Sequence, residues 1–142
     1  MAKSNHLTQE GSRNRGLLIV CIVLVILLGL ASRQMPFLFP KVLGKYPGDV
    51  LWSLMVFLGC AYLKPTASTS RLAIYTLIIS YGVELSQLIQ VPWIVSLRHT
   101  TLGHLILGTT FSWLDIVSYT MGISIGALGD YLWTRGGFNP GD

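Results

Sequence analysis

The chain has 142 residues, of which 51% are hydrophobic and only 11% are charged. A soluble domain carries about 25% charged residues, so this composition excludes a water-covered domain and predicts a single-domain, polytopic membrane protein. The net charge is +4, but the basic residues form no stripe that could follow phosphates, so we expect no nucleic-acid partner.

Residues 1–15 are polar and are interpreted as a short cytoplasmic tail. Residues 17–30 are almost continuously apolar and predict the first membrane helix. A basic segment followed by such a run also describes a signal peptide, with residues 29–31 as a cleavage site. The sequence does not decide between a cleaved signal and a retained helix over 17–31; we favour the retained helix.

The second helix is expected to begin at Pro47, with Asp49 in its first turn, where a carboxylate complements the helix dipole. Its apolar run covers residues 50–63. The third helix, about 72–89, differs because polar residues recur on one face at spacings of three and four: Thr76, Ser80, Glu84 and Gln87. Such a face must point away from lipid, and Pro92 is expected to end this helix.

The apolar part of the next segment, 93–111, is far too short to cross a bilayer, which takes about 20 residues. We predict a re-entrant loop or a short helix there. Ser112 would open the last helix, which runs to about Trp133. Gly122 and Gly126 form a Gly-x-x-x-Gly pair that permits close helix contact, either within the chain or in a homodimer.

The predicted fold is therefore all-α, with four transmembrane helices in one domain, 16–134, and a loose tail over 135–142. Both termini then lie on one side, which carries six basic residues against four on the other. The positive-inside rule makes that side cytoplasmic, as expected for a multi-pass protein of the inner (plasma) membrane. The chain order brings five charged residues toward the outer face: Arg33, Asp49, Glu84, Arg98 and Asp115.

An acid inside a bilayer costs several kcal/mol and by default indicates a functional site. Glu84 is therefore the candidate general base, with Gln87 or Arg98 as its partner. Arg33 and Arg98 would bind a phosphate or carboxylate. A structural alternative is that Glu84 belongs to a buried ion pair that only fixes the loop.

The other acids and Arg33 also have structural explanations. Asp115 completes a Ser-x-x-Asp capping box with Ser112. Asp49 could serve only the dipole of its helix, and Arg33 could be a topological anchor. In the functional interpretation, Asp49 and Asp115 orient the arginines.

His99 and His104 are five residues apart, a spacing that does not align on one helix face, and no cysteine cluster supports them as zinc ligands. We expect no metal and no cofactor. His104 is a weak candidate for a proton carrier beside Glu84, because a histidine titrates near neutral pH.

Several motifs occur in a fixed order along the chain: Gly-Leu-Ala-Ser-Arg at 29–33, Tyr-Pro-Gly-Asp-Val-Leu-Trp at 46–52, Val-Glu-Leu-Ser-Gln-Leu at 83–88, Leu-Arg at 97–98, Leu-Gly-His-Leu at 102–105 and Trp-Leu-Asp at 113–115. They resemble the bacterial family called domain of unknown function 2809, which brings no established activity.

A looser resemblance reaches the VanZ-like membrane proteins, whose pattern places an acid and a glutamine on one helix, then an arginine, then an aspartate leading a glycine-spaced helix. The residues that match are Glu84, Gln87, Arg98, Asp115, Gly122 and Gly126. The resemblance implies a role in the envelope and in tolerance of glycopeptides. Tyr119 departs from it, because that pattern usually has asparagine there.

We therefore expect an outer-face charged pocket that recognises or modifies an anionic envelope lipid or lipid-linked glycan. One alternative is a small proton-coupled transporter with Glu84 as the carrier. Another is a membrane scaffold whose ion pairs are only structural. The sequence leaves open which of these applies and whether any reaction is catalysed.

Overall fold

A computed structural model describes residues 13–35, 37 and 40–135 of the chain. It has four long helices, which are α1 (Arg15–Gln34), α2 (Tyr46–Leu63), α3 (Thr69–Ser86) and α6 (Trp113–Arg135). Three shorter elements connect them: η2 (Lys41–Leu43), α4 (Pro92–Arg98) and α5 (Thr101–Leu107). Within the described residues there is no β-strand, so the predicted all-α class is confirmed.

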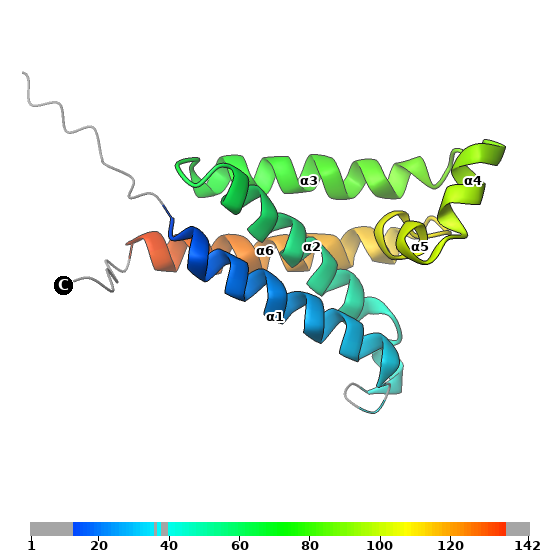
Figure 1. The fold of residues 1–142 in the computed structure, drawn as a ribbon, viewed down its shortest axis with the longest axis horizontal. Helices are drawn as coiled ribbons and strands as arrows, with labels where there is room; N and C mark the ends of the chain where they lie inside the picture. The colour runs from blue at the N-terminus through cyan, green and yellow to red at the C-terminus, as the bar shows by residue number, and fades with distance from the viewer. Residues whose placement is uncertain (1–12, 36, 38–39, 136–142) are drawn as a thin grey trace, which may run out of the picture.

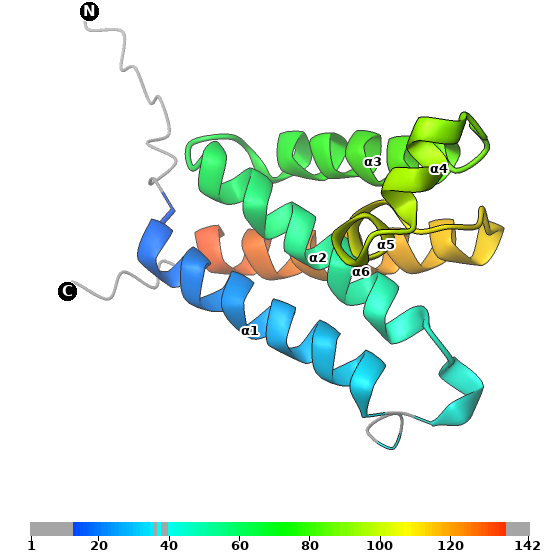
Figure 2. The same ribbon diagram turned by 45° about the vertical axis from the view of Figure 1, so that its right-hand side comes forward.

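The four long helices alternate in direction along the bundle (Figure 1). Helix α2 packs against α1, α3 and α6, and α3 also packs against α6. Helix α1 lies along the outside of α2, as the turned view in Figure 2 also shows. Helices α4 and α5 lie together at the end of the bundle opposite the start of α1 and the end of α6 (Figure 1).

Local sequence signals define the helix starts. The side chains of Asn14 and Ser68 accept hydrogen bonds from backbone N–H groups in the first turns of α1 and α3, and Thr100 does the same for α5. Pro47 and Asp49 occupy the first turn of α2, as predicted. Pro92 begins α4 instead of ending α3, which already stops at Ser86. The segment predicted as a re-entrant loop or a short helix contains two short helices.

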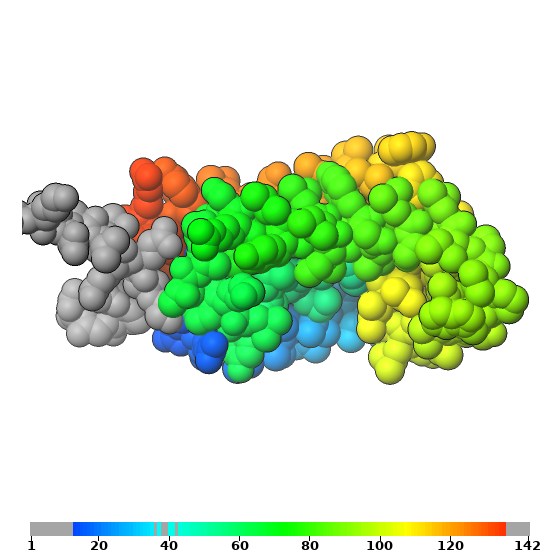
Figure 3. Space-filling model, turned by 90° about the horizontal axis from the view of Figure 1, so that it is seen from above, coloured from blue at the N-terminus to red at the C-terminus, as the bar shows by residue number. Residues whose placement is uncertain are grey.

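The polarity of the bundle is inverted relative to a soluble protein. The polar face predicted on α3 is buried, since Thr76, Ser80 and Glu84 are fully covered and Gln87 is 3% exposed. The exposed side of the same helix is apolar and includes Ile74, Ile78, Ile79 and Leu85. The surface of α3 runs along most of the molecule in Figure 3. A polar interior under an apolar surface suits a lipid environment.

Two helices, α1 and α2, are long and apolar enough to cross a membrane. Length and hydropathy thus support two of the four spans predicted, while α3 and α6 fall short by this measure because their buried faces are polar. No residue of α1 is buried, although its sequence is almost entirely apolar. An apolar helix that packs on one neighbour and has no fully buried residue indicates association with a membrane.

The Gly-x-x-x-Gly pair of α6 packs against α2 of the same chain. A Cβ atom at Gly122 would lie 1.9 Å from Ser53 Oγ, and one at Gly126 would lie 2.9 Å from the ring of Phe57. Both glycines therefore contact α2 of the same chain, and a second copy of the protein would have to pack on another surface. Close contact through small residues is the usual device for helices in membranes.

The end of the bundle that carries the described termini is closed by an ion pair. The Arg13 guanidinium donates to both carboxylate oxygens of Asp130, at 2.6 and 2.7 Å. Thr69 donates to the same carboxylate, and Arg13 also donates to the carbonyls of Pro65 and Ala67. Arg13 lies in the segment predicted as a tail, yet it is only 9% exposed. The rest of that tail, 1–12, and the tail predicted beyond Arg135 lie outside the described residues.

The α2–α6 contact predicts a specific effect of enlarging Gly122. In Gly122→Ala the new methyl group would also lie 2.3 Å from the carbonyl oxygen of Val50, so the helices would have to separate. Overpacking of this kind costs about 1–3 kcal/mol. We expect a lower midpoint of thermal unfolding in detergent micelles, measured by circular dichroism.

Gly129→Ala is the matched control, because its new methyl group would have no atom within 4 Å and alanine favours helix. Its midpoint should equal or exceed that of the natural protein. An unchanged midpoint for Gly122→Ala would contradict the close α2–α6 contact.

Candidate functional site

A cavity of about 350 Å³ lies at the end of the bundle where α4 and α5 sit. Five of the predicted site residues line it: Arg33, Asp49, Gln87, His104 and Asp115. Residues that were not predicted complete the wall: Lys45, Trp52, Leu105, Ile106, Gly108, Thr109, Thr110 and Tyr119. The predicted convergence of Arg33, Asp49 and Asp115 at one end of the bundle is thus present in the structure.

Glu84 lies just behind the cavity wall, and its carboxylate is fully buried. It accepts hydrogen bonds from the Ser112 backbone N–H at 2.7 Å, the Tyr119 hydroxyl at 3.1 Å and Gln87 Nε2 at 3.3 Å. Of the two partners predicted for Glu84, Gln87 and Arg98, the structure shows a hydrogen bond to Gln87. The carboxylate joins α3 to the start of α6, and both of its oxygens are occupied.

Arg98 is buried as well but does not line the cavity. Its guanidinium donates to the backbone carbonyls of Ser86 and Ile89, at the end of α3. The Ser86 carbonyl belongs to the last residue of α3, at the negative end of the helix dipole, which an arginine stabilises; Ile89 lies three residues beyond it. The observed contacts of Arg98 are therefore those of a helix cap, and they hold α4 against the end of α3.

Among the cavity residues that were not predicted, Lys45 carries the charge. Its ammonium lies 2.7 Å from Asp115 Oδ2, and its side chain is 56% exposed whereas that of Asp115 is 4% exposed. Partial burial lowers the pKa of Lys45, but the hydrogen bond to Asp115 and the nearby carboxylates outweigh it and raise the pKa above its usual value. The lysine therefore stays charged at the mouth of the cavity. In the sequence, only its position directly before α2, the helix that carries Asp49, could have indicated that Lys45 belongs to the site.

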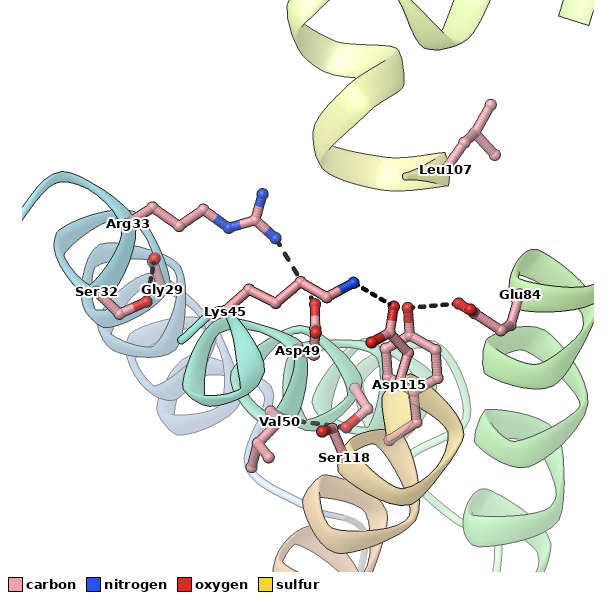
Figure 4. A network of polar contacts seen from close by, with 12 residues as sticks. Gly29, Ser32, Arg33, Lys45, Asp49, Val50, Glu84, Leu107, Asp115 and Ser118 are labelled. Carbon is pink, nitrogen blue, oxygen red and sulfur yellow. Dashed lines mark hydrogen bonds and ion pairs between the residues drawn. The ribbon is translucent and has the colours of Figure 1, made fainter. Parts of the chain in front are cut away.

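Arg33 also lines the cavity, and its guanidinium points toward Asp49, as Figure 4 shows. One guanidinium nitrogen lies 4.0 Å from Asp49 Oδ1, which is too long for a hydrogen bond. The side chain of Arg33 is 35% exposed, while Asp49 is 7% exposed as a residue. Gly48 leaves room for this arginine, since a Cβ there would lie 3.3 Å from its Nε atom.

Three acceptor atoms of cavity-lining residues are buried without a hydrogen-bond partner: Asp49 Oδ2, Asp115 Oδ1 and Gln87 Oε1. Leaving a buried acceptor unsatisfied costs about 1–3 kcal/mol. Asp115 makes its ion pair with Lys45, whereas the Ser112 backbone N–H, which the predicted capping box would give to Asp115, donates to Glu84 instead. These three acceptors therefore favour any rearrangement of the site that brings them a donor.

Two aromatic residues support this arrangement. The rings of Trp52 and Tyr119 lie 5.3 Å apart, centre to centre, and this contact fixes the ring whose hydroxyl reaches Glu84. His104 lines the cavity on α5, whereas His99 follows α4 and is exposed. Of the two histidines, only His104 is placed at the cavity.

A family model described as "Protein of unknown function (DUF2809)" matches residues 38–123. The chain belongs to this family. The match covers more than half of the chain and includes every cavity residue except Arg33. No solved structure matches the fold.

The environment of Glu84 predicts the effect of neutralising it. In Glu84→Gln one acceptor oxygen becomes an NH₂ group that faces other donors, and hydrogen bonds to a charged group, worth about 1.5–3 kcal/mol each, are lost. We expect a clear loss of stability to denaturant, read from tryptophan fluorescence in micelles.

Tyr119→Phe removes only one of the donors and should cost less than Glu84→Gln. If Glu84→Gln were as stable as the natural protein, the carboxylate would not be the link between α3 and α6.

Proposed function

We propose that the protein spans the inner (plasma) membrane with α1, α2, α3 and α6, and that its cavity binds the anionic group of an envelope lipid or lipid-linked glycan. One observation carries the proposal. Arg33 and Lys45 stand partly exposed at one cavity, at the end of a bundle whose outer surface is apolar. Cations in such a position are suited to a phosphate or carboxylate.

The inverted polarity supports spans for α3 and α6. Helix α6 has 23 residues, which at 1.5 Å per residue makes about 35 Å and exceeds a hydrocarbon core of about 30 Å. Its large exposed side chains include Leu114, Val117, Met121, Ile125, Leu128 and Leu132, and the hydroxyls of the exposed Thr120 and Ser124 donate to carbonyls of their own helix. The excess of basic residues near the described termini favours a cytoplasmic location for that end and an outward-facing cavity.

The wall formed by α5 favours a lipid over a soluble anion. Ile106 lines the cavity and is also 53% exposed on the apolar surface. Leu105 lines the cavity beside it, and Leu102 on the same helix is 70% exposed. A lipid could therefore place its head group in the cavity and keep its acyl chains against the bundle.

Binding without chemistry is the form of the proposal that the contacts favour. Glu84, the candidate base, already accepts three hydrogen bonds from the protein. For a proton-coupled transporter, Glu84 would need access from both sides. A cluster of Phe57, Ala61 and Leu72 fills the bundle between Glu84 and the Arg13–Asp130 pair, and this favours access from one side only. An envelope role like that of the VanZ-like proteins is compatible with such binding.

The test is to remove both cations at the cavity. For Arg33→Gln together with Lys45→Gln, we expect at least a tenfold loss of affinity for phosphatidylglycerol and for phosphatidylethanolamine, each titrated alone. The reason is that each charge-assisted hydrogen bond contributes about 1.5–3 kcal/mol. Native mass spectrometry of the detergent-purified protein counts the bound lipids directly.

Lys41→Gln is the matched control, because Lys41 is an exposed cation of η2 that does not line the cavity. Its affinities should equal those of the natural protein. Lipid binding that is unaffected by the double substitution, or equally weakened by Lys41→Gln, would contradict the proposed function.

A further inference from the structure

The charge balance of the cavity restricts what kind of anion it can hold. In the structure Lys45 neutralises Asp115, and Arg33 faces Asp49. If the two cations turn to a phosphate, two largely buried carboxylates lose their counter-charges while the ligand brings another negative charge. Buried charges without partners are strongly unfavourable. A purely anionic head group therefore fits poorly, and the ligand should bring a cation of its own.

The unused acceptors are the groups that such a cation would satisfy. Asp49 Oδ2, Asp115 Oδ1 and Gln87 Oε1 lack partners, and each belongs to a cavity-lining residue that is at least nine-tenths buried. A primary ammonium has three N–H donors and one positive charge, so it satisfies acceptors and charge together. A hydroxyl would supply only the hydrogen bond.

Lys45 shows that an ammonium suits this place. Its Nζ atom already binds Asp115 Oδ2, at the end of a flexible side chain that is more than half exposed. The lysine can swing from the carboxylate to a ligand phosphate once another ammonium takes its position. A metal ion is a poorer occupant, because among residues 13–35, 37 and 40–135 no three acidic, histidine or cysteine side chains are grouped to hold one.

Building on the proposed function, we propose that the cavity recognises a zwitterionic head group. Its phosphate is bound by Arg33 and Lys45, and its primary ammonium is bound by Asp49, Asp115 and Gln87. Phosphoethanolamine-type lipids have this chemistry. The proposed function allows any phosphate-bearing lipid, whereas this proposal requires a lipid whose head group also carries a primary ammonium.

The experiment titrates each lipid alone into the detergent-purified natural protein. Phosphatidylethanolamine should bind at least fivefold more tightly than phosphatidylglycerol, which lacks a cation, and than phosphatidylcholine, whose quaternary nitrogen has no N–H donor. Equal affinities for the three lipids would overturn the inference but leave the proposed function intact. Failure of all three to bind would overturn both.

Asp49→Asn and Asp115→Asn test the same point from the protein side. Each should abolish the preference for phosphatidylethanolamine, and an unchanged circular dichroism spectrum shows that the variant is folded. A preference that survives both substitutions would overturn the assignment. If either variant fails to fold, the lipid series on the natural protein decides the matter alone.

The zwitterionic group could belong to a membrane lipid or to a free phosphoamine. Competition between soluble O-phosphoethanolamine and phosphatidylethanolamine distinguishes the two. Competition only at concentrations far above those of the lipid supports a membrane lipid as the ligand. Competition at equal concentration supports the zwitterionic site but identifies a free phosphoamine as its occupant. No competition at any concentration, together with equal lipid affinities, would overturn the inference.

Discussion

Three carboxylates at one end of the helix bundle need compensation, and each obtains it from another part of the chain. Glu84 of α3 is held by the start of α6 and by Tyr119. Asp115 is neutralised by Lys45 from the turn before α2, and Asp49 faces Arg33 at the end of α1. Since buried carboxylates need hydrogen bonds or counter-charges, these contacts fix how the four long helices meet and where a cavity remains.

The rest of the bundle follows from this requirement and from the glycines of α6. Gly122 and Gly126 bring α6 close to α2, so Asp49 and Asp115 lie on adjoining helices at the same end. An apolar cluster around Phe57 fills the interior beyond them. The Arg13–Asp130 pair closes the opposite end. The result is a molecule with a charged cavity at one end and a closed, structural ion pair at the other.

Periodicity and chain order predicted much of this arrangement. The polar stripe of α3 could be read from residues three and four apart, because an apolar environment forces such a stripe inward. The gathering of Arg33, Asp49 and Asp115 followed from counting helices that alternate in direction. The number of spans is less directly supported, because the polar faces of α3 and α6 lower the hydropathy on which span assignment depends.

The positions of three basic residues could not be predicted, because they depend on the reach of long side chains and on where helices end. Lys45 looked like an ordinary loop cation, because only the folded structure shows that it reaches Asp115, 70 positions along the chain. Arg98 was expected in the pocket, but its place depends on where α3 stops, and the structure ends that helix before the predicted position. Arg13 was assigned to a tail because its partner, Asp130, lies at the far end of the sequence.

The most direct test of this account is to locate the phosphorus atom of a bound lipid in an experimental structure of the protein in lipid nanodiscs. We expect it between the Arg33 guanidinium and the Lys45 ammonium, with the acyl chains along α5. A lipid phosphate found elsewhere on the molecule, with the Lys45–Asp115 pair intact and the cavity holding only water, would contradict it.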